Sequence, residues 1–417
     1  MKRISRVIAA VLAALLMLSA FAGCHQKDAV VATYSANGKT YKLTSGQYAY
    51  AMILAESEGR NLVTEKLTDE EKKSGEEIDF YKKTIEKKKF ADWVTDRAEE
   101  LCREYFTIAS SFDKYKLELS DSDKEGKDSY LSYQWQMSGY MYICEPNGVS
   151  YESFASFQEV FSYQRNALLK HIYGEKGPKT VSKDDLTKSL TDNFVLANLL
   201  EIDSSRLVKE DTDEAKEAAK KEAQDKLNGY VDRLKLGETF KTIYDEYAAE
   251  QKAKEEADKK PTSSTTASSE ATSSESTSSE TSSANTSSTT SSEGKEELKP
   301  LDELATLLGS EESSTASEIF EDVAKCEIGV PTVIEKEGVY VLVIRKDITA
   351  DPYYTENYTN EALIILKGDE FDSDLAKDAK KVEIEFNNYE RNHIKPQKID
   401  YTLYQQYVAS MYGNYSY

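Results

Sequence analysis

The side chains best suited to catalysis or metal binding are few and widely spaced. The chain has three histidines, His25, His171 and His393, and none stands at metal-site spacing from a cysteine or another histidine. It has no glycine-rich phosphate loop, Ser-His-Asp order or reactive-cysteine signature. His171 falls on an apolar helical stripe, so we expect a histidine packed in the core. These residues predict no confident catalytic residue, no cofactor and no metal site.

The acidic segment 121–126, Asp-Ser-Asp-Lys-Glu-Gly, has part of the spacing of a calcium loop. Such a loop needs a bidentate glutamate at its twelfth position, where this chain has Ser132. Ser120 followed by acidic residues is instead typical of a helix start, because serine caps free backbone amides and acids favour the positive end of the helix dipole. We therefore predict a helix that begins after Ser120.

Cys24 stands at the end of an export-type segment. A basic start at residues 2–6 is followed by an apolar stretch, Val7–Leu18, and by small residues up to Gly23, the order found in signal peptides. The four residues Phe21-Ala22-Gly23-Cys24 resemble a bacterial lipobox, with Phe21 where leucine is usual. That resemblance implies that 1–23 is a signal peptide and that Cys24 is acylated. The alternative, an uncleaved membrane anchor, would need an apolar run of about 20 residues, and this run is shorter.

The body of the chain is acidic, with a formal charge of -22 over its 417 residues. Such a surface repels nucleic-acid phosphates, so we exclude nucleic-acid binding. It also disfavours lying on anionic lipid, which leaves membrane attachment to acylated Cys24. A disulfide framework is not expected, because only three cysteines remain, an odd number: Cys102, Cys144 and Cys326. We expect buried free thiols, although one pair could bridge.

Residues 24–180 read as a helical lobe with an N-terminal β-hairpin. Asn37-Gly38 joins two strand-like runs, a strong hairpin signal because both residue types tolerate positive φ. Apolar residues then recur at spacings of three and four from Phe90 to Phe112, and again from Ser150 to Tyr173. That periodicity predicts long amphipathic helices, which bury their apolar stripes against one another.

The rest of the mature chain alternates between strands and helices. Ser182 suits the cap of a helix, and residues 194–202 read as a strand. A charged helix follows over about 213–236, with Gly237 suited to its C-terminal cap. Residues 259–297 form a Ser/Thr-rich insertion, which we expect to be disordered because it has no large apolar side chains. Beyond it we expect a short helix at 319–324, a hairpin of two strands around Gly338, a mainly helical stretch from 357 to 392 and a tyrosine-rich tail.

The order of these pieces resembles the extracellular foldases of the SurA and PrsA type, which carry a parvulin-like peptidyl-prolyl isomerase domain. The resemblance rests on the Val-Val-Ala-Thr hairpin, the helix start at 181–186 and a series of loose motifs in the family's order. These motifs are Ala197-Asn198-Leu199-Leu200, Gly237-Glu238-Thr239-Phe240, Ile328-Gly329-Val330-Pro331-Thr332-Val333 and Gly338-Val339-Tyr340-Val341-Leu342. It implies that the strand at 195–202 pairs with the strand at 339–344 across the insertion.

Two departures from the family bear on activity. The histidine pair of active parvulins corresponds here to Asn198 and Tyr340, and the glycine- and phenylalanine-rich central motif is missing. Proline isomerisation must overcome a rotation barrier of ~18–20 kcal/mol, so a shaped site is needed. The resemblance therefore implies a degenerate domain that binds without catalysis.

The expected fold class is α+β: a mainly helical, chaperone-like lobe with its hairpin, and a small parvulin-like domain split by the insertion. The expected segments are a signal peptide (1–23), the helical lobe (24–180), the two parts of the small domain (181–258 and 298–350) around the insertion (259–297), and a C-terminal helical segment with the tail (351–417). By resemblance, the chain is a chaperone on the outer face of a bacterial cell membrane that binds newly exported, unfolded polypeptides, with the client crevice in the helical lobe. Two alternatives remain: an active parvulin-type isomerase and a solute-binding lipoprotein.

Overall fold

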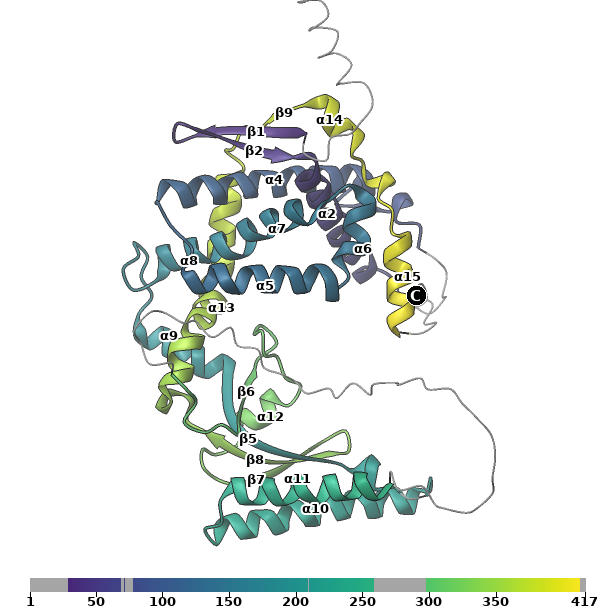
Figure 1. Ribbon diagram of the computed structural model, residues 1–417, viewed down its shortest axis with the longest axis vertical. Helices are drawn as coiled ribbons and strands as arrows, with labels where there is room; N and C mark the ends of the chain where they lie inside the picture. The colour runs from purple at the N-terminus through teal and green to yellow at the C-terminus, as the bar shows by residue number, and fades with distance from the viewer. Residues whose placement is uncertain (1–28, 69–70, 72–77, 209, 259–297, 413–417) are drawn as a thin grey trace, which may run out of the picture. The chain divides into compact units, whose positions relative to one another are not determined.

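The chain folds as an α+β protein, mostly helical, with small antiparallel sheets (Figure 1). The computed structural model describes residues 29–68, 71, 78–208, 210–258 and 298–412, so the signal segment, Cys24 and the insertion lie outside the described residues. The chain divides into two compact units. The first comprises the residues up to His171 together with Asp369 onward, and the second runs from Ile172 to Gly368. The last part of the chain thus belongs with the N-terminal lobe, which the sequence pattern did not indicate.

The first unit is built mainly of helices. Its elements are β1 (Val30–Ala36), β2 (Lys39–Thr44), α2 (Ser45–Glu65), η1 (Phe80–Lys82), β3 (Thr84–Ile85), β4 (Lys88–Lys89), α4 (Phe90–Lys114), α5 (Asp121–Met137), α6 (Tyr140–Cys144), η2 (Glu145–Asn147), α7 (Tyr151–Gln158), η3 (Glu159–Gln164), α8 (Arg165–Tyr173), β9 (Glu385–Phe386), α14 (Asn388–His393), η6 (Pro396–Lys398) and α15 (Thr402–Tyr412). The core lies between α2, α4 and α7, where Tyr50 meets the rings of Phe154 and Phe157 edge-on at 5.2 and 5.5 Å.

The predicted hairpin is present, and its strands gain a third partner from the far end of the chain. Asn37 and Gly38 have φ values of 55° and 74°, and β1 pairs with β2 antiparallel from Ala36↔Lys39 onward. On its other side β1 pairs with β9 through Ala32↔Phe386. The stretch 357–392 was expected to be mainly helical, and it is, except for residues 380–387, which contain this short strand.

The predicted helix at 150–173 is helical, but not a single α-helix. The π-helical segment η3 separates α7 from α8, and its wider turn shifts the face that later residues present. His171 is partly buried, with its ring 4.7 Å from the exposed ring of Tyr115. The expectation of a histidine packed in the core therefore holds only in part.

The second unit is a four-stranded sheet with helices. Its elements are α9 (Lys183–Asn193), β5 (Phe194–Asp203), η4 (Ser204–Leu207), α10 (Asp213–Lys235), α11 (Phe240–Asp258), β6 (Ala305–Gly309), α12 (Phe320–Ala324), β7 (Thr332–Lys336), β8 (Val339–Lys346), η5 (Ile348–Ala350) and α13 (Pro352–Ala379), within which the boundary to the first unit falls. The predicted caps are present: the Ser182 side chain accepts from the Asp185 amide, and Gly237 has φ 96°.

The sheet has the strand order β6-β5-β8-β7, all antiparallel. β5 pairs with β8 from Leu196↔Lys346 to Asp203↔Val339, so the expected pairing across the insertion is confirmed. Successive side chains of each strand point to opposite faces of the sheet. Leu200, Ile202 and Leu342 pack against α10 and α11, which lie side by side below the sheet in Figure 1. The opposite face, with Val195, Ala197, Val341 and Val343, packs against α12.

Cys102, Cys144 and Cys326 are all buried and free, as expected. Burial raises the pKa of the Cys144 thiol to about 12, so it is protonated at neutral pH. Among the described residues, none of the helices combines the length and the apolarity that a bilayer span requires.

Candidate functional site

The larger of the two pockets described here is a groove in the second unit, with a volume of about 950 Å³. Its floor is apolar and comes from three strands: Leu199 of β5, Leu308 of β6, and Val339 and Val341 of β8. These side chains belong to the sheet face that packs against α12. A volume of this size lies within the range of small-molecule sites and is also large enough for several side chains of a bound chain.

One border of the groove is an unpaired strand edge. β6 pairs with β5 only over residues 194–198, ending at Asn198↔Ala305, while β8 continues to Asp203. Among the described residues, no strand therefore lies on the β6 side of residues 199–203. Unpaired backbone amides and carbonyls at a sheet edge are ready hydrogen-bonding partners for another extended chain.

The wall beside this edge is the tyrosine-bearing side of α11. Tyr244 and Tyr247 line the groove, and the Tyr247 hydroxyl donates to the Glu201 carbonyl at 3.2 Å. Tyr244 is 38 % exposed, so its ring is available to a ligand. The Lys226 ammonium lies 5.0 Å from the centroid of the Tyr247 ring, a cation–π arrangement that holds the ring in place.

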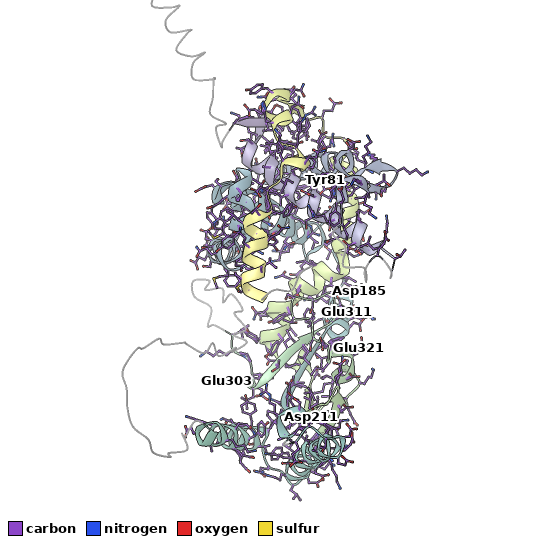
Figure 2. The ribbon with its side chains drawn as sticks, turned by 90° about the vertical axis from the view of Figure 1, so that its right-hand side faces the viewer. Tyr81, Asp185, Asp211, Glu303, Glu311 and Glu321 are labelled. Carbon is purple, nitrogen blue, oxygen red and sulfur yellow. The ribbon has the colours of Figure 1, made fainter. Side chains whose placement is uncertain are left out.

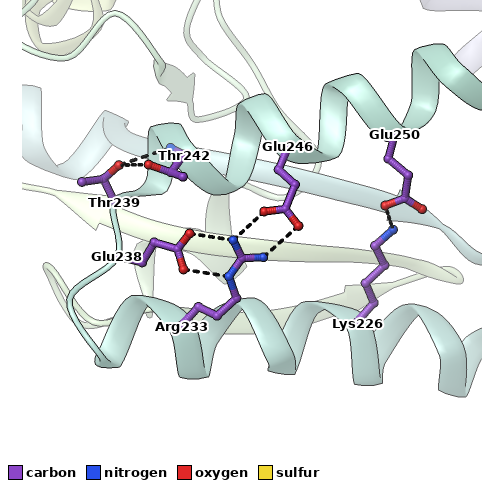
Figure 3. A network of polar contacts seen from close by, with 7 residues as sticks. All are labelled: Lys226, Arg233, Glu238, Thr239, Thr242, Glu246 and Glu250. Carbon is purple, nitrogen blue, oxygen red and sulfur yellow. Dashed lines mark hydrogen bonds and ion pairs between the residues drawn. The ribbon is translucent and has the colours of Figure 1, made fainter.

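A network of ion pairs fixes α11 to α10 (Figure 3). The Arg233 guanidinium bonds Glu238 through two nitrogens, at 2.6 and 2.8 Å, and bonds Glu246 at 2.6 and 3.1 Å. Lys226 bonds Glu250 at 2.5 Å. The hydrogen bonds to Arg233 lower the pKa values of Glu238 and Glu246. Bidentate guanidinium–carboxylate pairs are geometrically specific, so this network sets the position of the tyrosine wall.

The opposite rim joins the segment before α12 to the β7–β8 hairpin. The Lys336 ammonium donates to the Glu318 carbonyl, which ties the tip of the hairpin to that segment. Three exposed carboxylates, Glu201, Glu318 and Glu337, stand around the groove. The surface of this unit carries further exposed acids, among them Asp211, Glu303 and Glu311 (Figure 2). The groove is therefore apolar within and acidic at its margin.

The two positions that correspond to the family's histidines are not brought together. Asn198 pairs with Ile344 and Tyr340 pairs with Ile202, which offsets them by four residues, roughly 13 Å at ~3.3 Å per residue. Both belong to the face under α10 and α11, and neither lines the groove. Tyr340 is in that core. Asn198 is fully buried, and neither of its side-chain polar atoms makes a hydrogen bond of normal geometry, although its side chain is among the groups that lower the pKa of Asp302.

The first unit has a smaller pocket, of about 260 Å³. It is lined by residues of α2, the turn at 146–148 and the segment 390–399, including Ser45, Met52 and His393. The crevice expected in the helical lobe therefore does not coincide with the larger groove, which lies in the sheet unit. Within the part of the chain that the structure describes, no three His, Cys, Asp or Glu side chains gather so that they could hold a metal ion.

The groove residues were not singled out from the sequence. Leu199, Val339 and Val341 fall in predicted strands, but nothing local indicates that these strands meet Tyr244 and Tyr247 of α11. The one available signal was the spacing of two tyrosines three residues apart. Comparison of the chain with protein-family models, with curated proteins and with solved structures finds no match.

Proposed function

We propose that this protein is a lipid-anchored chaperone that binds newly exported, partly unfolded polypeptides outside the cell membrane, with Cys24 as the lipid attachment. The observation that carries the proposal is the groove of the second unit, with its apolar floor, tyrosine wall and acidic margin. Unfolded chains expose apolar side chains, which such a surface removes from water. Neither cofactor nor ATP is required, because a client leaves as it buries those side chains itself.

The second unit supports the resemblance to parvulin-like domains in the order of its elements. A strand (β5), a helix pair (α10 and α11), a strand (β6), a short helix (α12) and a hairpin (β7 and β8) follow one another. The strands on either side of the insertion belong to one sheet, as the resemblance requires. The proposal for this unit is a parvulin-like fold adapted to hold extended chains.

The chemistry of the groove favours binding over isomerisation. The chain's three histidines are residues 25, 171 and 393, and the second unit begins at Ile172 and ends at Gly368, so it contains none. Asn198 and Tyr340 lie under the helix pair instead of in the groove. A proline-peptide assay tests this directly, and we expect no acceleration of cis–trans exchange.

Aggregation of an unfolded client tests the chaperone function. We expect the lipid-free mature chain to slow aggregation at near-equimolar ratio, and the double variant Tyr244→Ser/Tyr247→Ser to lose most of that effect. Tyr133→Ser is the matched control, because Tyr133 is 60 % exposed on α5 of the first unit. If the wild-type chain has no effect, the proposal fails. If only the Tyr133 variant loses activity, the client surface belongs to the helical unit.

A further inference from the structure

We propose that the client binds in extended form as an added β-strand, paired with residues 199–203 of β5 on the side where β6 has ended. This inference rests on the proposed function and specifies how the same groove recognises its ligand. Main-chain pairing would provide affinity for any sequence, and alternate side chains would enter the groove.

The direction of the backbone groups at this edge follows from one contact. The Glu201 carbonyl accepts the Tyr247 hydroxyl at 3.2 Å, and Tyr247 belongs to the groove wall beside the free edge. In an antiparallel sheet, alternate residues direct both backbone groups to the same neighbouring strand. Leu199 and Asp203 therefore share the direction of Glu201, away from β8. A five-residue edge with three outward-directed residues is enough to pair a short extended segment.

The chain's own preceding segment turns away from this edge. A direct extension of β6 backward from Ala305 would have covered residues 199–203. Instead the Ala305 and Leu304 amides bond the carbonyl and carboxylate of Asp302 in a tight turn, and Asp302 forms an ion pair with Lys346 of β8 at 2.9 Å. Residues 199–203 are thus left without a neighbouring strand among the described residues, beside a groove that is already formed. The Glu201 carbonyl accepts the Tyr247 hydroxyl, so a client amide would share or replace that hydrogen bond.

The groove favours a separate polypeptide over the chain's own insertion as the occupant. Its floor and tyrosine wall suit β-branched or aromatic side chains at alternate positions, and Glu201, Glu318 and Glu337 suit lysine or arginine at the flanks. Residues 261–293 contain only Pro, Ser, Thr, Ala, Glu and Asn. They have neither large apolar nor basic side chains, so we commit to a client segment that combines both.

N-methylation of a probe peptide tests strand addition separately from binding. The probe is a fluorescent nine-residue peptide of alternating valine and threonine with a lysine at each end, bound to the lipid-free mature chain and followed by anisotropy. Two versions carry N-methyl groups on alternate amides, which keeps the side chains and removes one set of N–H donors. We expect one set to weaken binding at least tenfold and the other less than twofold, with slowed hydrogen exchange at the Leu199 and Glu201 amides.

Two variants of one residue provide the matched test on the protein side. Glu201→Pro removes an outward N–H, a change that an edge strand tolerates, while Glu201→Gln removes only the charge. We expect at least a tenfold loss for the first and a small, salt-dependent loss for the second. If Glu201→Pro does not fold, the N-methyl comparison decides alone. Equal binding of both methylated peptides, or no peptide binding while aggregation is still slowed, overturns strand addition and leaves the chaperone function standing. Tighter binding after deletion of 261–293 would make the insertion the occupant and overturn the choice of a client.

Discussion

The C-terminal helix α15 offers the sharpest test of the packing, through Gly139. This glycine has φ 77°, and a Cβ built on it would lie 2.4 Å from the Tyr407 ring of α15. The ring cannot simply move aside, because it stacks on Tyr142 at 4.5 Å and its hydroxyl donates to the Met137 carbonyl at 2.7 Å. Gly139→Ala should therefore both strain the backbone and undock α15.

Gly148 is the matched control for the free-energy cost of placing alanine at positive φ. Its φ is 76°, almost the same, but a Cβ there would meet nothing within 4 Å. Positive φ costs an alanine about 1–2 kcal/mol, and this cost is common to both variants. Gly139→Ala should lose in addition about 1 kcal/mol for the hydrogen bond and about 0.5–1.5 kcal/mol for the stacked rings. We expect Gly139→Ala to be more destabilising than Gly148→Ala by about 2 kcal/mol.

Urea unfolding of the mature chain measures both free energies, and hydrogen exchange of residues 402–411 reports on α15. In a Tyr407→Ala background the excess cost of Gly139→Ala should vanish, because the clashing ring is gone. Equal destabilisation by the two glycine variants in the wild-type background would refute the reasoning. So would an excess that persists after Tyr407 is removed.

Four further predictions concern buried and paired groups. Arg60→Met should destabilise the first unit by about 3–5 kcal/mol, because it leaves the fully buried carboxylate of Glu56, now bonded by Arg60 at 2.8 Å, without its cation; urea unfolding should show most of that loss restored in Glu56→Gln/Arg60→Met. Cys144 should resist thiol reagents at pH 8 until the chain is unfolded, since burial raises its pKa to about 12; early labelling would contradict this. The stability difference between wild type and Arg233→Met should be present at neutral pH and shrink as pH falls below about 4.3, the ordinary glutamate value, because the pKa values of its two glutamate partners are lowered in the folded state; melting curves at pH 7 and pH 3 test this. Asn198→Leu should stabilise the second unit by about 1–3 kcal/mol by removing a buried amide that makes no hydrogen bond of normal geometry, and a lower melting temperature would contradict it.

Local structure could be predicted from the sequence wherever a few adjacent residues determine it. The turn at Asn37-Gly38, the cap at Ser182 and the hairpin around Gly338 all follow from short-range chemistry. The pairing of β5 with β8 joins distant segments, and it was expected only from the resemblance in the order of the motifs. It succeeded because both strands are long enough to show a pattern.

The groove could not be predicted, because it depends on where a strand stops. β6 begins only at Ala305 because of the turn formed by residues 302–305, and a turn of four residues leaves little trace in hydrophobic periodicity. β9 was missed for a similar reason, since a two-residue strand has no period to detect. Asn198 and Tyr340 lie in the strands that the motifs indicated, but they are not neighbours in the sheet. Strand register depends on long-range pairing, which the motifs do not specify.

The closure of the first unit by β9 bears on when this protein can finish folding. The Asn387 side chain reaches the Val30 carbonyl across 357 positions of sequence, and the Asn387 amide bonds the Val31 carbonyl at 2.8 Å. A polypeptide that crosses a membrane from its N-terminus would present β1 and β2 long before their third strand emerges. The second unit, whose segments all lie between these ends, would complete first. If the chain is exported as proposed, one stalled late in export would have a complete groove while its first unit still lacks β9.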